Sequence, residues 1–154
     1  MFRKLTLLLI TWNVDAARPD ALAEGVVNTG FLQEALRTVD SPDIIAFGLQ
    51  EVIDLESRRM TAKNVLLGAK KKDDNGLSEK VSTGYKKWHD RFLYAVRLAM
   101  PANTQYSVTH TDSLVGLFSC VLMKNSERGT LKDVVVSNVK RGMGGRYGNK
   151  VSVT

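Results

Sequence analysis

The 154-residue chain is 44% hydrophobic and 25% charged, a composition that excludes disorder along its whole length and suffices for one domain with a buried core. Its formal net charge is +6, and the excess lies at the C-terminal end, where seven basic and two acidic residues follow Met123. Such a region attracts polyanions, whether nucleic acid, anionic lipid or inositol phosphate, or is a solvated surface, and its sign does not choose among them. The single cysteine, Cys120, excludes an internal disulfide and indicates a buried strand thiol in a reducing compartment.

The chain begins with basic residues and an apolar run, which is also the outline of a signal peptide. The run from Leu5 to Ile10 is shorter than a signal peptide requires and far shorter than a membrane span. We therefore predict a buried strand over Leu5–Val14 and a cytoplasmic chain.

Thr29 can cap a helix whose apolar residues share one face and which ends before Pro42. The nearly all-apolar run Ile44–Leu49 predicts a second buried strand. A short helix over Ser57–Leu67 and an exposed loop over Ala69–Glu79 are expected next.

From Ser78 to Met100, apolar residues recur at steps of three and four and predict one long amphipathic helix. Strand-like runs then follow at Tyr106–Thr111, Leu114–Met123, Leu131–Val139 and Lys150–Thr154. Helices in the first two thirds and strands in the last third predict a layered α/β fold with a mixed sheet and flanking helices.

Polar residues follow the first two predicted strands where each strand ends, at Asn13 and at Gln50 and Glu51. If the strands are neighbours, an amide and a carboxylate converge at one edge of the sheet, where open α/β sheets place their sites. These hard oxygen ligands suit Mg²⁺, which needs few protein groups. A turn-capping role for Asn13 remains open.

The segment 139–150 contains four glycines between Gly142 and Gly148, together with Arg141, Arg146 and Lys150. Glycine lets the backbone approach an anion closely, and the basic side chains add positive charge. The alternative is a flexible hairpin connection between two strands.

Four segments in this order resemble the inositol polyphosphate 5-phosphatases of the endonuclease/exonuclease/phosphatase superfamily: Thr11–Val14, Pro42–Val52, Leu114–Phe118 and Gly142–Lys150. The insertion rich in Lys and Asp and the long helix resemble those of fungal members. The resemblance implies a DNase I-like, four-layer α/β sandwich of which residues 1–154 form the N-terminal part, truncated at the C-terminus. It implies that Asn13 and Glu51 are the catalytic, metal-site residues for Mg²⁺, supported by Gln50. It also implies that Arg146, Asn149 and Lys150 bind the phosphorylated substrate.

The expected activity is therefore Mg²⁺-dependent removal of the 5-phosphate from phosphoinositides or soluble inositol polyphosphates, with peripheral contact to anionic membranes and no specific nucleic acid. The family's later segments, which supply the catalytic His and the Asp that activates water, have no counterpart here, and Val151 stands where the family has glycine. We thus expect the chain to be inactive alone. A nuclease of the same superfamily and a non-catalytic inositide-binding module are the alternatives.

Overall fold

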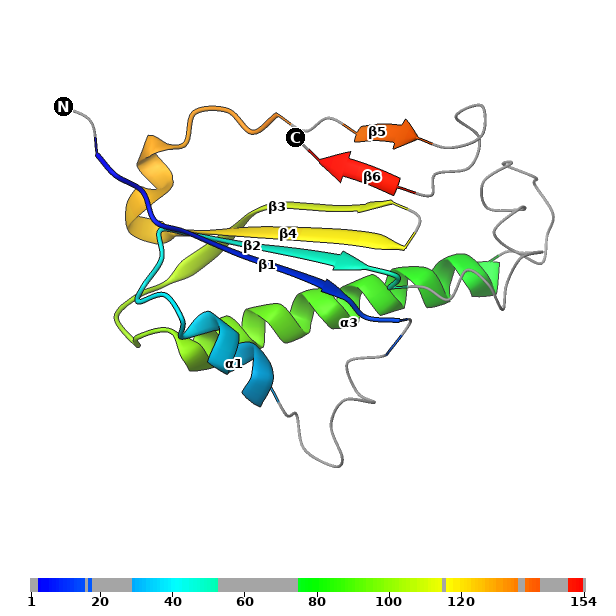
Figure 1. The fold of residues 1–154 in the computed structure, drawn as a ribbon, viewed down its shortest axis with the longest axis horizontal. Coiled ribbons are helices and arrows are strands. Elements are labelled where there is room, and N and C mark those ends of the chain that lie inside the picture. The colour runs from blue at the N-terminus through cyan, green and yellow to red at the C-terminus, as the bar shows by residue number, and fades with distance from the viewer. Residues whose placement is uncertain are drawn as a thin grey trace.

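The computed structural model describes residues 3–15, 17, 29–52, 75–114, 116–135, 138–141 and 150–153 (Figure 1). In chain order the elements are β1 (Leu7–Asn13), α1 (Gly30–Leu36), β2 (Ile44–Gln50), α3 (Asn75–Ala99), β3 (Tyr106–Leu114), β4 (Leu117–Lys124), the 3-10 helix η2 (Asn125–Thr130), β5 (Asn138–Arg141) and β6 (Lys150–Val153).

Four strands form one mixed sheet in the order β1-β2-β4-β3. β1 and β2 run parallel, whereas β4 is antiparallel to both β2 and β3. β5 and β6 pair with each other as an antiparallel two-stranded sheet. Helices α1 and α3 both lie along one face of the four-stranded sheet (Figure 1). The predicted α/β class with a mixed sheet and flanking helices is confirmed.

The core lies between that face of the sheet and the two helices. Alternate residues of each strand point to the helices, since side chains alternate between the faces of a sheet. On β2 the buried residues are Ile45, Phe47 and Leu49, and α3 contributes Trp88 and Phe92 among others. The rings of Phe47 and Phe92 stack with their centroids 4.0 Å apart. Each such side chain contributes about 1.5–3 kcal/mol through burial.

The other residues of β1 are exposed on the opposite face, with 57% of Leu7 and 62% of Leu9 accessible. β1 was predicted as a buried strand, and it is buried on its helix-facing side, where Leu8 is 8% exposed.

Several predicted boundaries are wrong, among them the end of α1, which lies at Leu36 and not just before Pro42. Helix α3 begins at Asn75, inside the predicted loop, because each residue added to an existing helix gains a hydrogen bond at little extra cost. A strand was expected over Leu131–Val139, but residues Leu131 to Val135 do not form one. The β-branched residues of this run suit a strand, but Val135 is 85% exposed, and a strand is stabilised by its neighbours rather than by propensity alone.

Another wrong boundary is at Leu114, which ends β3 instead of beginning β4. Gly116 has a φ of 83° and lies in the turn between these strands. The predicted helix over Ser57–Leu67 lies outside the described residues.

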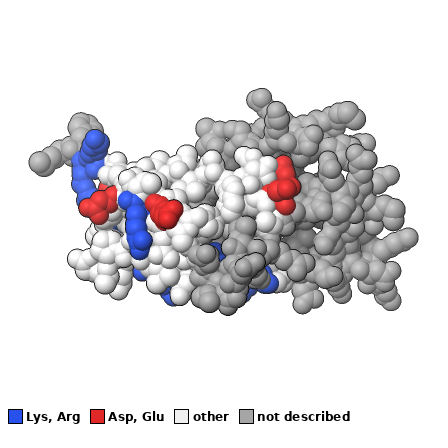
Figure 2. All heavy atoms as spheres, turned by 60° about the horizontal axis from the view of Figure 1, so that its bottom comes forward, with Lys and Arg blue, Asp and Glu red and all other residues white. Residues whose placement is uncertain are grey.

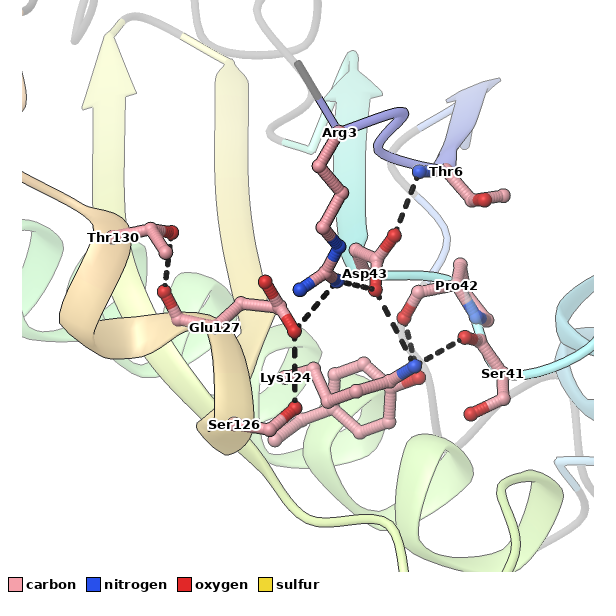
Figure 3. A network of polar contacts seen from close by, with 10 residues as sticks. Arg3, Thr6, Ser41, Pro42, Asp43, Lys124, Ser126, Glu127 and Thr130 are labelled. Carbon is pink, nitrogen blue, oxygen red and sulfur yellow. Dashed lines mark hydrogen bonds and ion pairs between the residues drawn. The ribbon is translucent and has the colours of Figure 1, made fainter. Parts of the chain in front are cut away.

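A polar network closes the end of the sheet where β1 and β2 begin (Figure 3). Asp43 accepts a hydrogen bond from the Thr6 backbone N–H at 2.8 Å and lies 3.5 Å from the Lys124 ammonium and 3.4 Å from Arg3. Arg3 also pairs with Glu127 at 2.7 Å. The Thr6 hydrogen bond is the main cause that lowers the pKa of Asp43, and Lys124 and Arg3 act in the same direction. The network thus joins the N-terminal segment to the strands β2 and β4.

Candidate functional site

The parallel pairing of β1 and β2 brings their carboxyl ends together (Figure 1). In this register Asn13 lies beside Gln50, so Glu51 follows directly at the same edge of the sheet. The Asn13 side-chain amide donates a hydrogen bond from Nδ2 to Oε1 of Glu51 at 2.8 Å. Both residues are exposed. The structure therefore brings together the two side chains that the sequence placed at neighbouring strand ends.

The orientation of the Asn13 amide is set by a second hydrogen bond. Its Oδ1 accepts the backbone N–H of Asp15 at 3.0 Å, which forms a local turn just past the strand. With the oxygen directed at Asp15, the nitrogen faces Glu51. The turn-capping role and the contact with Glu51 thus occur in the same side chain.

Glu51 has a backbone φ of 54°, in the left-handed region. This conformation costs a residue with a Cβ atom about 1–2 kcal/mol. It is held on both sides, because Val14 N–H donates to the Gln50 carbonyl at 3.0 Å and Val52 N–H donates to the Gly116 carbonyl at 2.9 Å. Strained residues of this kind cluster at functional sites, where the surrounding structure maintains them.

An aromatic cluster supports the end of β1 next to the site. The Trp12 ring makes edge contacts with Phe31 of α1, at 4.9 Å between centroids, and with Trp88 of α3, at 5.6 Å. Such contacts are favourable beyond their buried area and have defined geometry. They fix the strand end from which Asn13 projects.

The donor set at this edge suits a hard divalent cation. Mg²⁺ in proteins commonly binds one or two carboxylates and keeps several waters, and the exposed Glu51 carboxylate is one such ligand. Asn13 donates a hydrogen bond to this carboxylate, and hydrogen bonds of this kind orient the side chains that bind metals. Within the described ranges, no three His, Cys, Asp or Glu side chains gather in a way that would hold a metal ion.

The other predicted site residues are placed only in part. Gln50 ends β2 with its side chain exposed. Lys150 begins β6 and pairs through its backbone with Arg141, but its side chain lies outside the described part of the structure, as do Arg146 and Asn149. Their predicted role in substrate binding stays a prediction.

Charge is mixed on one face of the described part of the molecule. On the face drawn in Figure 2, acidic and basic side chains are interspersed and do not form a patch of one sign among the residues coloured there. The helices that the structure describes include none long and apolar enough to cross a membrane.

Sequence reasoning missed two residues that shape the site. Asp15, with a φ of 47°, closes the turn on Asn13, and Gly116 contacts the backbone next to Glu51. Gly116 lies within one of the four motif segments, but its partner Val52 is 64 positions away, a separation that no local pattern reveals.

The comparison with known proteins agrees with the fold. Residues 10–154 match endonuclease/exonuclease/phosphatase family 2. The chain is 32% identical over 152 residues to a probable inositol polyphosphate 5-phosphatase of Schizosaccharomyces pombe, covering 99% of this chain and 13% of that protein. It is 24% identical to human synaptojanin-2 over 163 residues, covering 99% of this chain and 10% of that protein.

Among solved structures, the chain is similar to the inositol polyphosphate 5-phosphatase domain of SPsynaptojanin, crystallised in complex with inositol (1,4)-bisphosphate and a calcium ion. The TM-score is 0.60 at 17% identity, over 97% of this chain and 34% of that one. The chain thus spans a third of that domain and 13% or less of the two curated relatives. The resemblance predicted from the four segments is confirmed. The family match over residues 10–154 establishes that this chain belongs to the endonuclease/exonuclease/phosphatase family.

Proposed function

We propose that residues 1–154 carry part of the active site of a Mg²⁺-dependent phosphatase that removes the 5-phosphate from inositol phosphates or phosphoinositides. The observation that carries the proposal is the hydrogen bond of 2.8 Å between Asn13 and Glu51 at adjacent parallel strand ends. The names of the similar proteins give the substrate class, since both the S. pombe relative and the similar domain are called inositol polyphosphate 5-phosphatases.

In this proposal Glu51 is the direct cation ligand and Asn13 holds its carboxylate in place. Glu51 would hold a divalent cation, whose positive charge would stabilise the phosphoryl oxygens of the substrate. Asn13 would restrict the rotation of the Glu51 carboxylate, so that less entropy is lost when the cation binds. Direct ligation by Asn13 would require its amide to turn and to release the Asp15 N–H.

Cation binding is the first test. Terbium luminescence excited through the tryptophans, with displacement by Mg²⁺, measures binding by the purified chain. Glu51→Gln should weaken Tb³⁺ binding at least tenfold, because it removes the negative ligand while keeping the shape of the side chain. Glu34→Gln is the matched control, since Glu34 is an exposed glutamate on α1. Equal affinity of the wild type and Glu51→Gln would contradict the proposed role of Glu51.

Phosphate release is the second test. We propose that this chain is the N-terminal part of one catalytic domain, so that the chain alone should release no phosphate from a 5-phosphorylated inositide. A chimera in which residues 1–154 replace the matching third of the SPsynaptojanin domain should release it in a Mg²⁺-dependent manner, and Glu51→Gln should abolish the release. A chimera that folds and binds Tb³⁺ but never releases phosphate would argue against the phosphatase assignment. Nicking of plasmid DNA by that chimera would instead indicate a nuclease.

The basic C-terminal region also suggests peripheral contact with anionic membranes. Co-sedimentation of the chain with vesicles containing phosphatidylinositol 4,5-bisphosphate tests this part of the proposal. The triple variant Arg141→Ala, Arg146→Ala and Lys150→Ala should bind less than the wild type, and equal binding would refute it.

A further inference from the structure

The orientation of Glu51 depends on the peptide groups on either side of it. Its left-handed backbone is unfavourable and persists only where neighbouring groups hold it. On the following side, the group that holds it is the carbonyl of Gly116, which accepts the Val52 N–H at 2.9 Å. Whatever fixes Gly116 therefore also affects the direction in which the Glu51 carboxylate projects.

Gly116 is fixed by a side chain from another element. Its backbone N–H donates to the hydroxyl oxygen of Tyr85, on α3, at 3.0 Å. Gly116 is buried, so its N–H would lack water if the hydroxyl were removed. Its φ of 83° is available to glycine and strained for other residues. The turn between β3 and β4 is thus tied to α3 through the Gly116 N–H.

Tyr85 is suited to this role because its ring is held independently of its hydroxyl. The ring stacks on Phe118 of β4, with 5.8 Å between centroids and 26° between planes. Burial raises the pKa of Tyr85, so the hydroxyl stays neutral at physiological pH. The neutral hydroxyl oxygen has a lone pair that can accept the Gly116 N–H.

We propose that Tyr85 is a positioning residue for the cation site: its hydroxyl holds Gly116, Gly116 holds Val52, and Val52 keeps Glu51 in the left-handed conformation. The inference rests on the proposed function for the role of Glu51, but not for the link from Tyr85 to the Glu51 backbone. This positioning role requires the Tyr85 hydroxyl, whereas a packing role would depend on the ring alone.

The test uses Tyr85→Phe, which removes the hydroxyl and keeps the ring. Tyr94→Phe is the matched control, because Tyr94 lies on the same helix and is 44% exposed. Three quantities are measured by NMR and luminescence on the full chain: the exchange rates of the Gly116 and Val52 amide protons, the three-bond HN–Hα coupling of Glu51, and the Tb³⁺ affinity.

In Tyr85→Phe the Gly116 and Val52 amides should exchange about three- to tenfold faster, as expected for the loss of one hydrogen bond. The Glu51 coupling should move away from its wild-type value, and Tb³⁺ should bind about three- to tenfold more weakly. Amides in the middle of β2 and β4 should keep their rates, and Tyr94→Phe should match the wild type throughout.

Unchanged Val52 exchange and Glu51 coupling in Tyr85→Phe would overturn the inference. So would a uniform acceleration of all strand amides with a lower melting temperature, because that pattern indicates a purely structural residue. A wild type that binds no Tb³⁺, with Val52 and Glu51 still responding to Tyr85→Phe, would refute the metal role of Glu51 while supporting the backbone link.

Discussion

Replacing Glu51 by glycine and, separately, by alanine should reverse the usual order of stability of these two residues. Both replacements remove the carboxylate and its hydrogen bond with Asn13, so these losses cancel in the comparison. What differs is the backbone, because position 51 has a φ of 54°. Alanine pays about 1–2 kcal/mol for that conformation and glycine does not.

Glycine has a cost of its own, because it makes the unfolded chain more flexible. Relative to alanine, this lowers the free energy of unfolding by about 0.4–1 kcal/mol. The difference leaves Glu51→Gly more stable than Glu51→Ala by up to about 1.6 kcal/mol, with a central value of about 0.8 kcal/mol. In a chain of this size 1 kcal/mol shifts the melting temperature by about 2–4 °C. Glu51→Gly should therefore melt about 1–3 °C above Glu51→Ala.

The assay is urea unfolding of both variants, followed by tryptophan fluorescence and confirmed by thermal melts. Glu34, an exposed residue within α1, provides the control pair. There Glu34→Gly should be less stable than Glu34→Ala by about 1 kcal/mol, because glycine is a poor helix former. If Glu51→Gly were also the less stable of its pair, Glu51 would not have a left-handed backbone in solution, and the argument that its conformation is held for function would be refuted.

Three other predictions concern the parts of the fold that support the site. Phe92→Ala should destabilise the chain by about 3–5 kcal/mol in urea unfolding, because Phe92 is fully buried and stacks on Phe47; a loss below 1 kcal/mol would contradict this packing. Asp43→Asn should cost about 1–2 kcal/mol at pH 7. The pKa of Asp43 is lowered in the folded state, so its contribution to stability is complete above the ordinary carboxyl pKa and is lost as the pH falls through the lower folded value. The difference in stability between the wild type and Asp43→Asn should therefore shrink between pH 5 and pH 2, and a constant difference would contradict this prediction. Burial raises the pKa of Cys120 to about 12, so iodoacetamide should label the native chain at pH 8 at least ~100-fold more slowly than the urea-unfolded chain. The free energy of unfolding should also fall as the pH rises above about 9, because only the thiol of the unfolded chain ionises there.

The local patterns of the sequence predicted the types of β1, β2 and α3 and the two strand ends that form the candidate site. Apolar runs at Leu5–Val14 and Ile44–Leu49 contain β1 and nearly all of β2, because burial on the helix side requires apolar residues there. The spacing of Trp88, Phe92 and Val96 likewise predicted the buried side of α3. Polar residues directly after apolar runs identified Asn13 and Glu51, since such groups are costly unless they have partners.

Only the tertiary structure decided how these residues are held. That β1 and β2 are parallel neighbours follows from the packing of the whole sheet, and this pairing brings Asn13 within 2.8 Å of Glu51. The link from Tyr85 through Gly116 to Val52 joins three segments that are distant in sequence, and hydrogen bonds to backbone groups leave no pattern of residue types. The left-handed backbone of Glu51 leaves no pattern in the sequence for the same reason, because a glutamate does not favour it and the backbone hydrogen bonds of Gln50 and Val52 hold it.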